Sequence, residues 1–194
     1  DDIFNLNKNR TKEILKGIIS LDFKINLYIC GIRMDLLDEE TINLMKEAGV
    51  RYLGCGLESG DERIQKDIKK NVDLTKFKRN CEIVYKKNIF ITAGIIFGFR
   101  NENFNSFLKT LNYVLSLKLH SIMVSTLRIY PDTELSRKES HLLPTNDRGL
   151  YTDYFLSNSS FKTFLYKYIL NILFYLSPTR LFIIIRDLPN KNIK

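Results

Sequence analysis

The sequence has no tryptophan, only four prolines, nine glycines and three cysteines among its 194 residues. So little glycine and proline excludes a collagen-like or low-complexity chain, and 44% hydrophobic residues suffice for one domain with a real core. Cys30, Cys55 and Cys81 are too far apart for a disulfide scaffold or a compact metal motif, so we expect reduced, buried thiols in a cytoplasmic protein. No apolar run approaches the roughly 18 residues of a membrane-spanning helix, and neither a transmembrane segment nor a signal peptide is predicted.

Charge is in excess on the positive side, with 30 lysines and arginines against 22 acidic residues and a formal net charge of +8. A positive chain indicates an anionic partner, but the basic residues are scattered and form no motif for nucleic acid. The sequence therefore gives no clear indication of a nucleic-acid partner. His120 and His141 have no potential ligand residues near them in sequence, and we expect both at the surface or at an interface.

Helical and strand patterns alternate along the first two thirds of the chain. Helices are predicted at 10–20, 38–48, 61–69, 74–87 and 104–115, and strands at 25–30, 52–57, 89–97 and 122–129. Asp38 is expected to cap the second helix and Gly49 to end it. Such βα units form a parallel sheet, in either a (β/α) barrel or a doubly wound fold.

In both folds ligands bind at the carboxyl ends of the strands. Arg33 follows the first predicted strand, Glu58 and Ser59 follow the second, and Arg100 and Glu102 follow the third. Carboxylates, guanidinium groups and hydroxyls at one edge of a sheet are suited to the amino, carboxylate and ribose groups of a polar ligand.

The segments at these strand ends resemble motifs of radical S-adenosylmethionine (radical SAM) enzymes. Residues 54–62 resemble G-I-E-S-G, and residues 33–49 resemble an R-x-D strand end followed by an L-x-x-A-G helix. Residues 94–102 resemble G-x-x-x-G-x-P-G-E-T, and residues 130–135 resemble Y-P-G-T-E-L. Residues 1–4 resemble the D-D-x-F strand end of the branch that often carries a cobalamin-binding domain. The five segments occur in the family's order.

The resemblance implies a partial (β/α)6 barrel and a [4Fe–4S] cluster that reductively cleaves S-adenosylmethionine to a 5′-deoxyadenosyl radical. It also implies an electron donor such as flavodoxin or ferredoxin, while the substrate stays unknown. Eight residues would surround the cofactor by analogy: Asp2, Arg33, Glu58, Ser59, Gly98, Glu102, Leu127 and Ile129. By the same analogy, Arg33 and Glu58 would contact the methionyl carboxylate and ribose region, and Gly98 would allow close approach of the adenosyl group. No catalytic residue is implied.

The sequence departs from the family because it contains no C-x3-C-x2-C motif for the cluster. We expect the cluster cysteines upstream of Asp1, and therefore interpret the chain as an N-terminally truncated fragment, inactive alone, of a longer enzyme. Residues 1–138 are assigned to the radical SAM core. A cobalamin-binding domain, if the full protein has one, would also lie outside these residues.

Two other functions stay open at this point. One is a degenerate, cluster-free (β/α) scaffold without catalytic activity, and the other is a different barrel enzyme with Glu58 and Glu102 as an acid–base pair. Residues 139–194 are assigned to a linker and a helical extension, with a helix at 161–176 that Ser177-Pro178 stops and a second apolar segment at 181–188. We expect the extension to pack on the barrel or on another domain, and the alternative is binding to a membrane surface.

Overall fold

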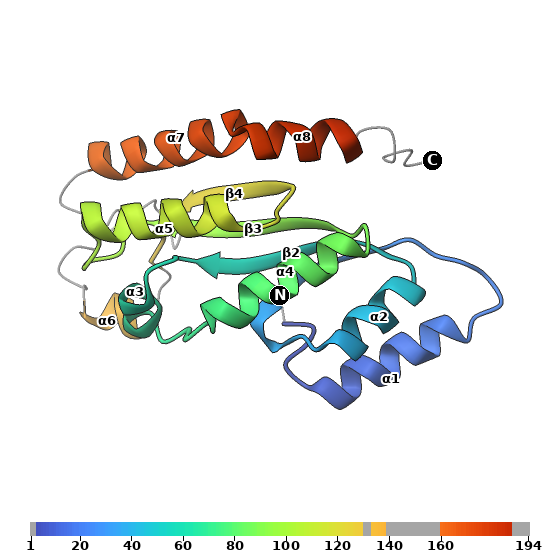
Figure 1. Ribbon diagram of the computed structural model, residues 1–194. Coiled ribbons are helices and arrows are strands. Elements are labelled where there is room, and N and C mark those ends of the chain that lie inside the picture. Colours follow the sequence, from blue (N-terminus) through green and yellow to red (C-terminus); the bar gives the residue numbers. More distant parts are fainter. Residues whose placement is uncertain (1–2, 130–132, 139–159, 188–194) are drawn as a thin grey trace, which may run out of the picture.

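The computed structural model describes residues 3–129, 133–138 and 160–187 (Figure 1). The helices are α1 (Lys8–Ile19), η1 (Met34–Leu36), α2 (Glu39–Glu47), α3 (Glu62–Asp67), α4 (Leu74–Lys86), α5 (Phe104–Ser116), α6 (Glu134–Lys138), α7 (Ser160–Leu176) and α8 (Pro178–Asp187). The strands are β1 (Leu27–Ile32), β2 (Val50–Glu58), β3 (Phe90–Phe97) and β4 (Ser121–Thr126). The predicted alternation of helices and strands is confirmed.

The four strands form one parallel sheet in the order β1-β2-β3-β4, which is the order of the chain. Each of the first three strands is followed by at least one helix that returns the chain to the opposite edge, so all the carboxyl ends meet at the same edge. This open sheet with sequential neighbours is the architecture of a partial (β/α) barrel, as the resemblance implied.

The helices cover one face of the sheet. α2 packs on β2, and α4 packs on β3. α5 is in contact with β3 through Phe107 and Phe97, whose ring centroids are 5.8 Å apart. Along β3 every second residue, from Ile91 to Phe97, is buried beneath these helices, and the residues between them are half-buried. The hydrophobic core therefore lies on the helical side of the sheet. In the described part of the chain, the strand residues on the other side are half-buried or exposed, and we call this side the open face.

Short polar side chains begin the helices. Asp38, Asp61, Asp73 and Asn103 each accept a hydrogen bond from a backbone N–H in the first turn of the helix that follows. The predicted cap at Asp38 is thus confirmed. Gly49 has a φ of +88° and sits directly against the Ile25 carbonyl, where any Cβ would collide.

Apart from the end of β3, the strand boundaries differ from the sequence prediction by one to three residues, and two of the shifts have a clear cause. β1 begins at Leu27, because the Leu27 N–H is the first to donate a hydrogen bond to the neighbouring chain, at the Gly49 carbonyl, and Leu27 is the first residue that pairs with β2. β4 ends at Thr126, because Gly98 turns β3 away with a φ of +103° and leaves the residues beyond Leu127 without a partner strand. Leu127 and Ile129 therefore lie in the loop that follows β4.

The carboxyl-terminal helices pack on the sheet beside α5. The Tyr166 ring of α7 stacks on Phe107 with centroids 4.2 Å apart, and the Tyr175 hydroxyl lies 3.3 Å from both backbone groups of Ile122 in β4. α7 ends just before Ser177-Pro178, as predicted, and α8 starts at that proline. Within the described residues, no helix is long and apolar enough to cross a membrane.

Candidate functional site

The open face of the sheet is lined by small residues in its middle. The parallel register places Gly54 beside Thr92, and Gly56 beside Gly94. The Thr92 and Ser121 hydroxyls of β3 and β4 are 2.6 Å apart on the same face. Because three of these positions are glycine, this face leaves room for a ligand to lie close to the backbone.

Aromatic rings close the amino-terminal end of this face. Tyr28 of β1, Tyr52 of β2 and Phe90 of β3 are aligned in register, with centroids 6.3 Å and 5.8 Å apart. His120 stacks on Phe90 at 4.5 Å, and its Nδ1 accepts the Ile91 N–H. His120 is 6% exposed, so the expectation of a surface or interface residue was wrong. His141 lies outside the described residues.

An ion pair stands at the carboxyl end of β2. The Glu58 carboxylate accepts a hydrogen bond from the Lys70 ammonium group, and the two side chains are only 17% and 22% exposed. The pair lies directly over Gly56, where an added Cβ would come within 2.5 Å of both Glu58 Oε1 and Lys70 Nζ. The pair therefore presents one negative and one positive group above the glycine-lined face.

The backbone at Glu58 is held in an unusual conformation. Glu58 has a φ of +66°, which is uncommon for a residue other than glycine. The Gln65 amide of α3 donates to the carbonyls of Leu57 and Ser59, at 2.6 Å each, and the Ser59 N–H donates to Leu57 at 2.9 Å. These bonds on either side fix the direction in which the Glu58 side chain leaves the strand.

Ser59 is turned away from the open face. Its hydroxyl lies 3.0 Å from the Thr110 hydroxyl of α5 and accepts the Asp61 N–H at 3.1 Å, and the residue is 3% exposed. Next to it, an added Cβ on Gly60 would lie 2.8 Å from the Tyr113 side chain. Ser59 therefore joins β2 to α5, and the structure gives it no open contact for a ligand.

At the end of β1, Arg33 is held by its neighbours. Its Nε and Nη2 donate to the Asp35 carboxylate at 2.9 Å and 2.7 Å, and its backbone exchanges two bonds with the Asn5 side chain. The hydrogen bond to Asp35 raises the pKa of Arg33. Arg33 is thus a fixed cation, since two of its nitrogens are already in use. Asp2, predicted to lie near the cofactor, is outside the described residues.

The ends of β3 and β4 meet at Gly98. The Gly98 N–H donates to Glu102 Oε2 at 2.9 Å, and the Leu127 N–H donates to the Phe97 carbonyl at 2.8 Å. Ile129 is 5% exposed, so its side chain is buried. Burial raises the pKa of Glu102 to about 7, against the opposing effects of the Gly98 N–H and the Lys162 ammonium group.

The raised pKa makes folding pH-dependent. Between about pH 4.5 and 7 the folded protein keeps a proton on Glu102 that the unfolded chain releases, so the free energy of unfolding falls as the pH rises. In Glu102→Gln the amide oxygen can still accept the Gly98 N–H. We expect the loss of unfolding free energy between pH 5 and pH 8 to be about 2 kcal/mol smaller in this variant than in the wild type. Urea unfolding at the two pH values measures this difference, and Glu82→Gln, on the exposed side of α4, is the control. An unchanged pH slope in Glu102→Gln would contradict this role.

The three cysteines do not form a metal site. Cys55 and Cys81 are buried in the core, where burial raises the pKa of both thiols, that of Cys55 to about 12. Cys30 is exposed on β1, so the expectation of a buried thiol was wrong for this residue. No group of three histidine, cysteine or acidic residues in the described ranges could hold a metal ion. The residues present therefore do not fit an iron–sulfur cluster.

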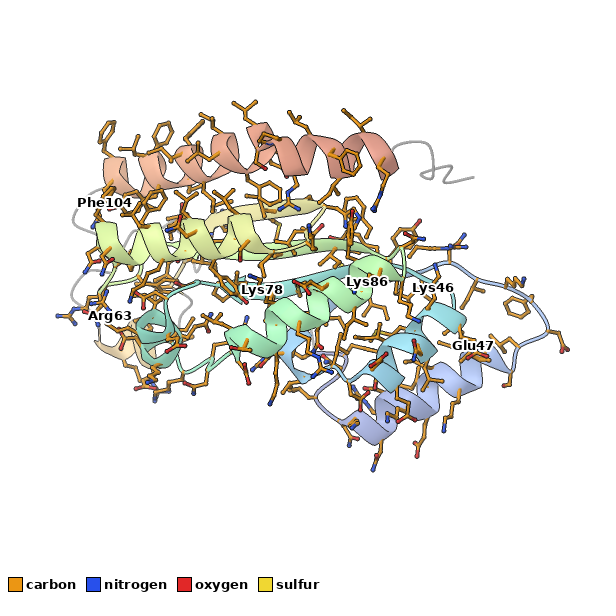
Figure 2. The ribbon with its side chains drawn as sticks, viewed as in Figure 1. Lys46, Glu47, Arg63, Lys78, Lys86 and Phe104 are labelled. Atoms are coloured by element: carbon orange, nitrogen blue, oxygen red, sulfur yellow. The ribbon has the colours of Figure 1, made fainter. Side chains whose placement is uncertain are left out.

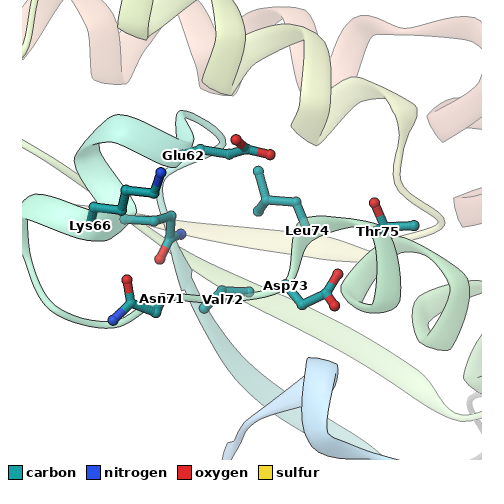
Figure 3. Close-up of a pocket in the computed structure, with 8 residues that line it drawn as sticks. Glu62, Lys66, Asn71, Val72, Asp73, Leu74 and Thr75 are labelled. Carbon is teal, nitrogen blue, oxygen red and sulfur yellow. The ribbon is translucent and has the colours of Figure 1, made fainter.

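A separate hollow of about 290 Å³ lies between α3 and the start of α4 (Figure 3). Glu62 and Lys66 of α3 line one side, and Asn71, Asp73 and Thr75 line the other. Both charge signs occur there, and Asp73 already caps α4. This hollow shows no selective chemistry, and the strand ends stay the better candidate.

The structure thus brings Arg33, Glu58, Gly98 and Leu127 to the ends of four neighbouring strands. Arg63 and Phe104 lie at the same end of the molecule (Figure 2), where Arg63 donates to the Asn101 carbonyl at 3.2 Å. Sequence reasoning missed Lys70 and Gln65. The signal for Lys70 was its place between the short helix α3 and α4, because this connection stays near the carboxyl end of β2 until α4 returns the chain to the other edge.

Comparison with known proteins agrees with this geometry. The family model described as Radical SAM superfamily matches residues 3–114. A protein named putative methylthiotransferase MJ0865, from Methanocaldococcus jannaschii, is 26% identical over 172 residues, which cover 82% of this chain and 37% of that protein. The chain therefore spans little more than a third of this relative.

Two solved structures share the fold. One is TsrM from Kitasatospora setae, a radical S-adenosylmethionine methyltransferase solved with tryptophan and a SAM analogue bound. The two structures superpose with a TM-score of 0.62 at 19% sequence identity, and the matched region covers 71% of this chain and 28% of the TsrM chain. The other is coproporphyrinogen III oxidase (HemN) from Escherichia coli, with a TM-score of 0.61 at 16% sequence identity. The matched region covers 88% of this chain and 37% of the HemN chain. At these identities the similarity concerns the fold.

Proposed function

Because the chain belongs to the radical SAM superfamily, we propose that it forms the part of a radical SAM enzyme that binds S-adenosylmethionine at the carboxyl ends of β1–β4. The observation that carries the proposal is the Glu58–Lys70 pair above Gly56. A carboxylate and an ammonium group at a half-buried site complement the amino and carboxylate groups of the methionine moiety.

The neighbouring residues extend this arrangement. Lys70 would bind the methionyl carboxylate, and Glu58 would bind the amino group or a ribose hydroxyl. Arg33 keeps Nη1 for a further contact while Asp35 fixes its position. Gly98 and the Leu127 backbone would border the adenosyl group, because no side chain stands at Gly98 and its turn is held by Glu102.

A [4Fe–4S] cluster would supply the electron for reductive cleavage, but its ligands would have to come from outside these 194 residues. The same absence of a cysteine motif favours the second candidate, a cluster-free (β/α) scaffold. A [4Fe–4S] cluster bound to the full-length protein would support the radical SAM enzyme over the cluster-free scaffold.

Other features of the full protein remain proposals. TsrM has also been solved with cobalamin and a [4Fe-4S] cluster bound, which supports a search for cobalamin binding in the full-length protein. A flavodoxin or ferredoxin as electron donor and a cytoplasmic location are proposed on family resemblance alone. No substrate is proposed.

The binding proposal is tested by calorimetry on the full-length protein. We expect S-adenosylmethionine to bind at least about tenfold more tightly than adenosine, because adenosine lacks the groups that Glu58 and Lys70 recognise. Gly56→Val, which places side-chain atoms in the space of the ion pair, should remove this preference. Equal affinity for both ligands, or no binding of S-adenosylmethionine, would contradict the proposed site.

A further inference from the structure

The middle of the open face has a space that none of the described side chains fills. Gly94 lies in the middle of β3, with Gly56 beside it in β2 and Met123 beside it in β4. A Cβ added to Gly94 would have two atoms within 4 Å, the Cys55 carbonyl oxygen at 3.7 Å and the Gly56 Cα at 4.0 Å, and both belong to the backbone. We call the space over Gly94 the central gap.

The other two glycines on this part of the open face are covered by side chains. The Tyr52 ring leans over Gly54, since an added Cβ there would lie 3.4 Å from Cε1 and 3.5 Å from the hydroxyl oxygen of Tyr52. The ion pair of Glu58 and Lys70 covers Gly56. A ligand can therefore reach the backbone at the central gap without moving a described side chain, and it cannot do so over the other two glycines.

Strand geometry sets the size of the central gap. Along β3 the next residues on the same face are Thr92 and Ile96, whose Cα atoms are about 13 Å apart, and β2 and β4 on either side are about 10 Å apart. The side chains at these borders take up part of this area, and the rest has room for one or two fused rings. A flat ring contacts a glycine backbone over its whole face, whereas a puckered ring touches it at fewer atoms.

The side chains at the borders decide which chemistry fits the central gap. Met123 is 63% exposed, and its polarisable thioether makes favourable contacts with aromatic rings. The Thr92 and Ser121 hydroxyls, 2.6 Å apart, use one of their two hydrogens for each other, and neither has a further partner in the described part of the chain. The second hydrogen can therefore donate to a ring nitrogen or a carbonyl oxygen. A purely aliphatic group would leave this hydrogen without a partner.

We propose that the central gap holds an aromatic heterocycle of the substrate, flat against the Gly94 backbone, with a ring nitrogen or carbonyl oxygen at the Thr92 and Ser121 hydroxyls. Met123 and Tyr52 would border the ring, as apolar walls with a few placed polar groups do in ligand sites. The ion pair adjoins the gap, so S-adenosylmethionine bound there would lie beside the ring. The inference rests on the proposed function, because it names the class of substrate for the same site.

Binding of 2-aminopurine to the full-length protein tests this proposal, because this fluorescent purine is flat and carries ring nitrogens. We expect saturable binding with and without saturating S-adenosylmethionine, and displacement by adenine but not by cyclohexanol, whose ring is puckered. Gly94→Leu should weaken binding of 2-aminopurine by about tenfold or more, since its side chain fills the gap. The same variant should weaken calorimetric binding of S-adenosylmethionine far less, whereas an unfolded variant would lose both.

Two further variants accompany this experiment. Gly17→Leu makes the same change on exposed α1, where an added Cβ meets nothing within 4 Å, and it should bind 2-aminopurine as the wild type does. Met123→Ser changes an exposed side chain and leaves the core intact. It should weaken binding of 2-aminopurine by about threefold or more, because the contact between thioether and ring is lost.

Three results would overturn the proposal. They are no saturable binding of 2-aminopurine, equal binding by Gly94→Leu and the wild type, and displacement of 2-aminopurine by S-adenosylmethionine, which would place the probe in the adenosyl site. A different result would separate this inference from the proposed function. If the wild type binds no S-adenosylmethionine but binds 2-aminopurine, and Gly94→Leu does not, the ring site is supported and the proposed function is contradicted.

Discussion

Replacing Lys70 with methionine is expected to weaken S-adenosylmethionine binding to the full-length protein by about 10- to 100-fold, the size of one charge-assisted hydrogen bond. The methionine side chain keeps much of the volume but lacks the ammonium group. Glu58 would then stay half-buried without its cation, and the proposed partner of the methionyl carboxylate would be lost. Calorimetric titration with S-adenosylmethionine measures the change.

Lys69→Met provides the control for this experiment. Lys69 precedes Lys70 in the chain, but its side chain is 71% exposed and pairs with Glu134 at the surface. Binding by Lys69→Met should stay within about twofold of the wild type, because an exposed ion pair contributes little. Wild-type affinity in Lys70→Met would remove Lys70 from the proposed site.

Arg180→Ala is expected to destabilise the protein by about 3 kcal/mol, because buried hydrogen-bonding groups would lose their partners. Arg180 is 1% exposed, donates to the carbonyls of Leu117 and Leu119, and lies 4.1 Å from the Phe174 ring centroid. Burial lowers the pKa of the guanidinium to about 10. This side chain thus ties α8 to the connection between α5 and β4.

Urea unfolding compares Arg180→Ala with Arg186→Ala. Arg186 is exposed on α8 and lies over the Tyr85 ring at 4.5 Å, so its removal should cost less than about 1 kcal/mol. Equal losses in the two variants would show that the bonds of Arg180 to the two carbonyls do not hold α8 in place.

Much of the fold was predictable because local patterns and tertiary structure agree. The run from Ile89 to Phe97 is apolar because β3 is covered on one face and half-buried on the other. Phe77, Cys81 and Val84 recur at helical spacing and form the buried side of α4. The burial predicted for Cys81 is confirmed.

The site was less predictable because it depends on how distant segments meet. Motif order identified Glu58, but its left-handed conformation depends on Gln65, and its ion pair depends on the path of the chain through α3 to Lys70. Ser59 belongs to the same motif, yet its hydroxyl is taken up by Thr110 of α5. Likewise, nothing near His120 in sequence indicates its bond to Ile91 in the neighbouring strand.

The most direct test of the proposed function is the product formed from S-adenosylmethionine. The full-length protein, reconstituted anaerobically with iron and sulfide and reduced with dithionite, should release 5′-deoxyadenosine and methionine in equal amounts, and Glu58→Gln should release far less. A full-length protein that holds no cluster and releases no 5′-deoxyadenosine would contradict the radical SAM function and leave the cluster-free scaffold as the better description.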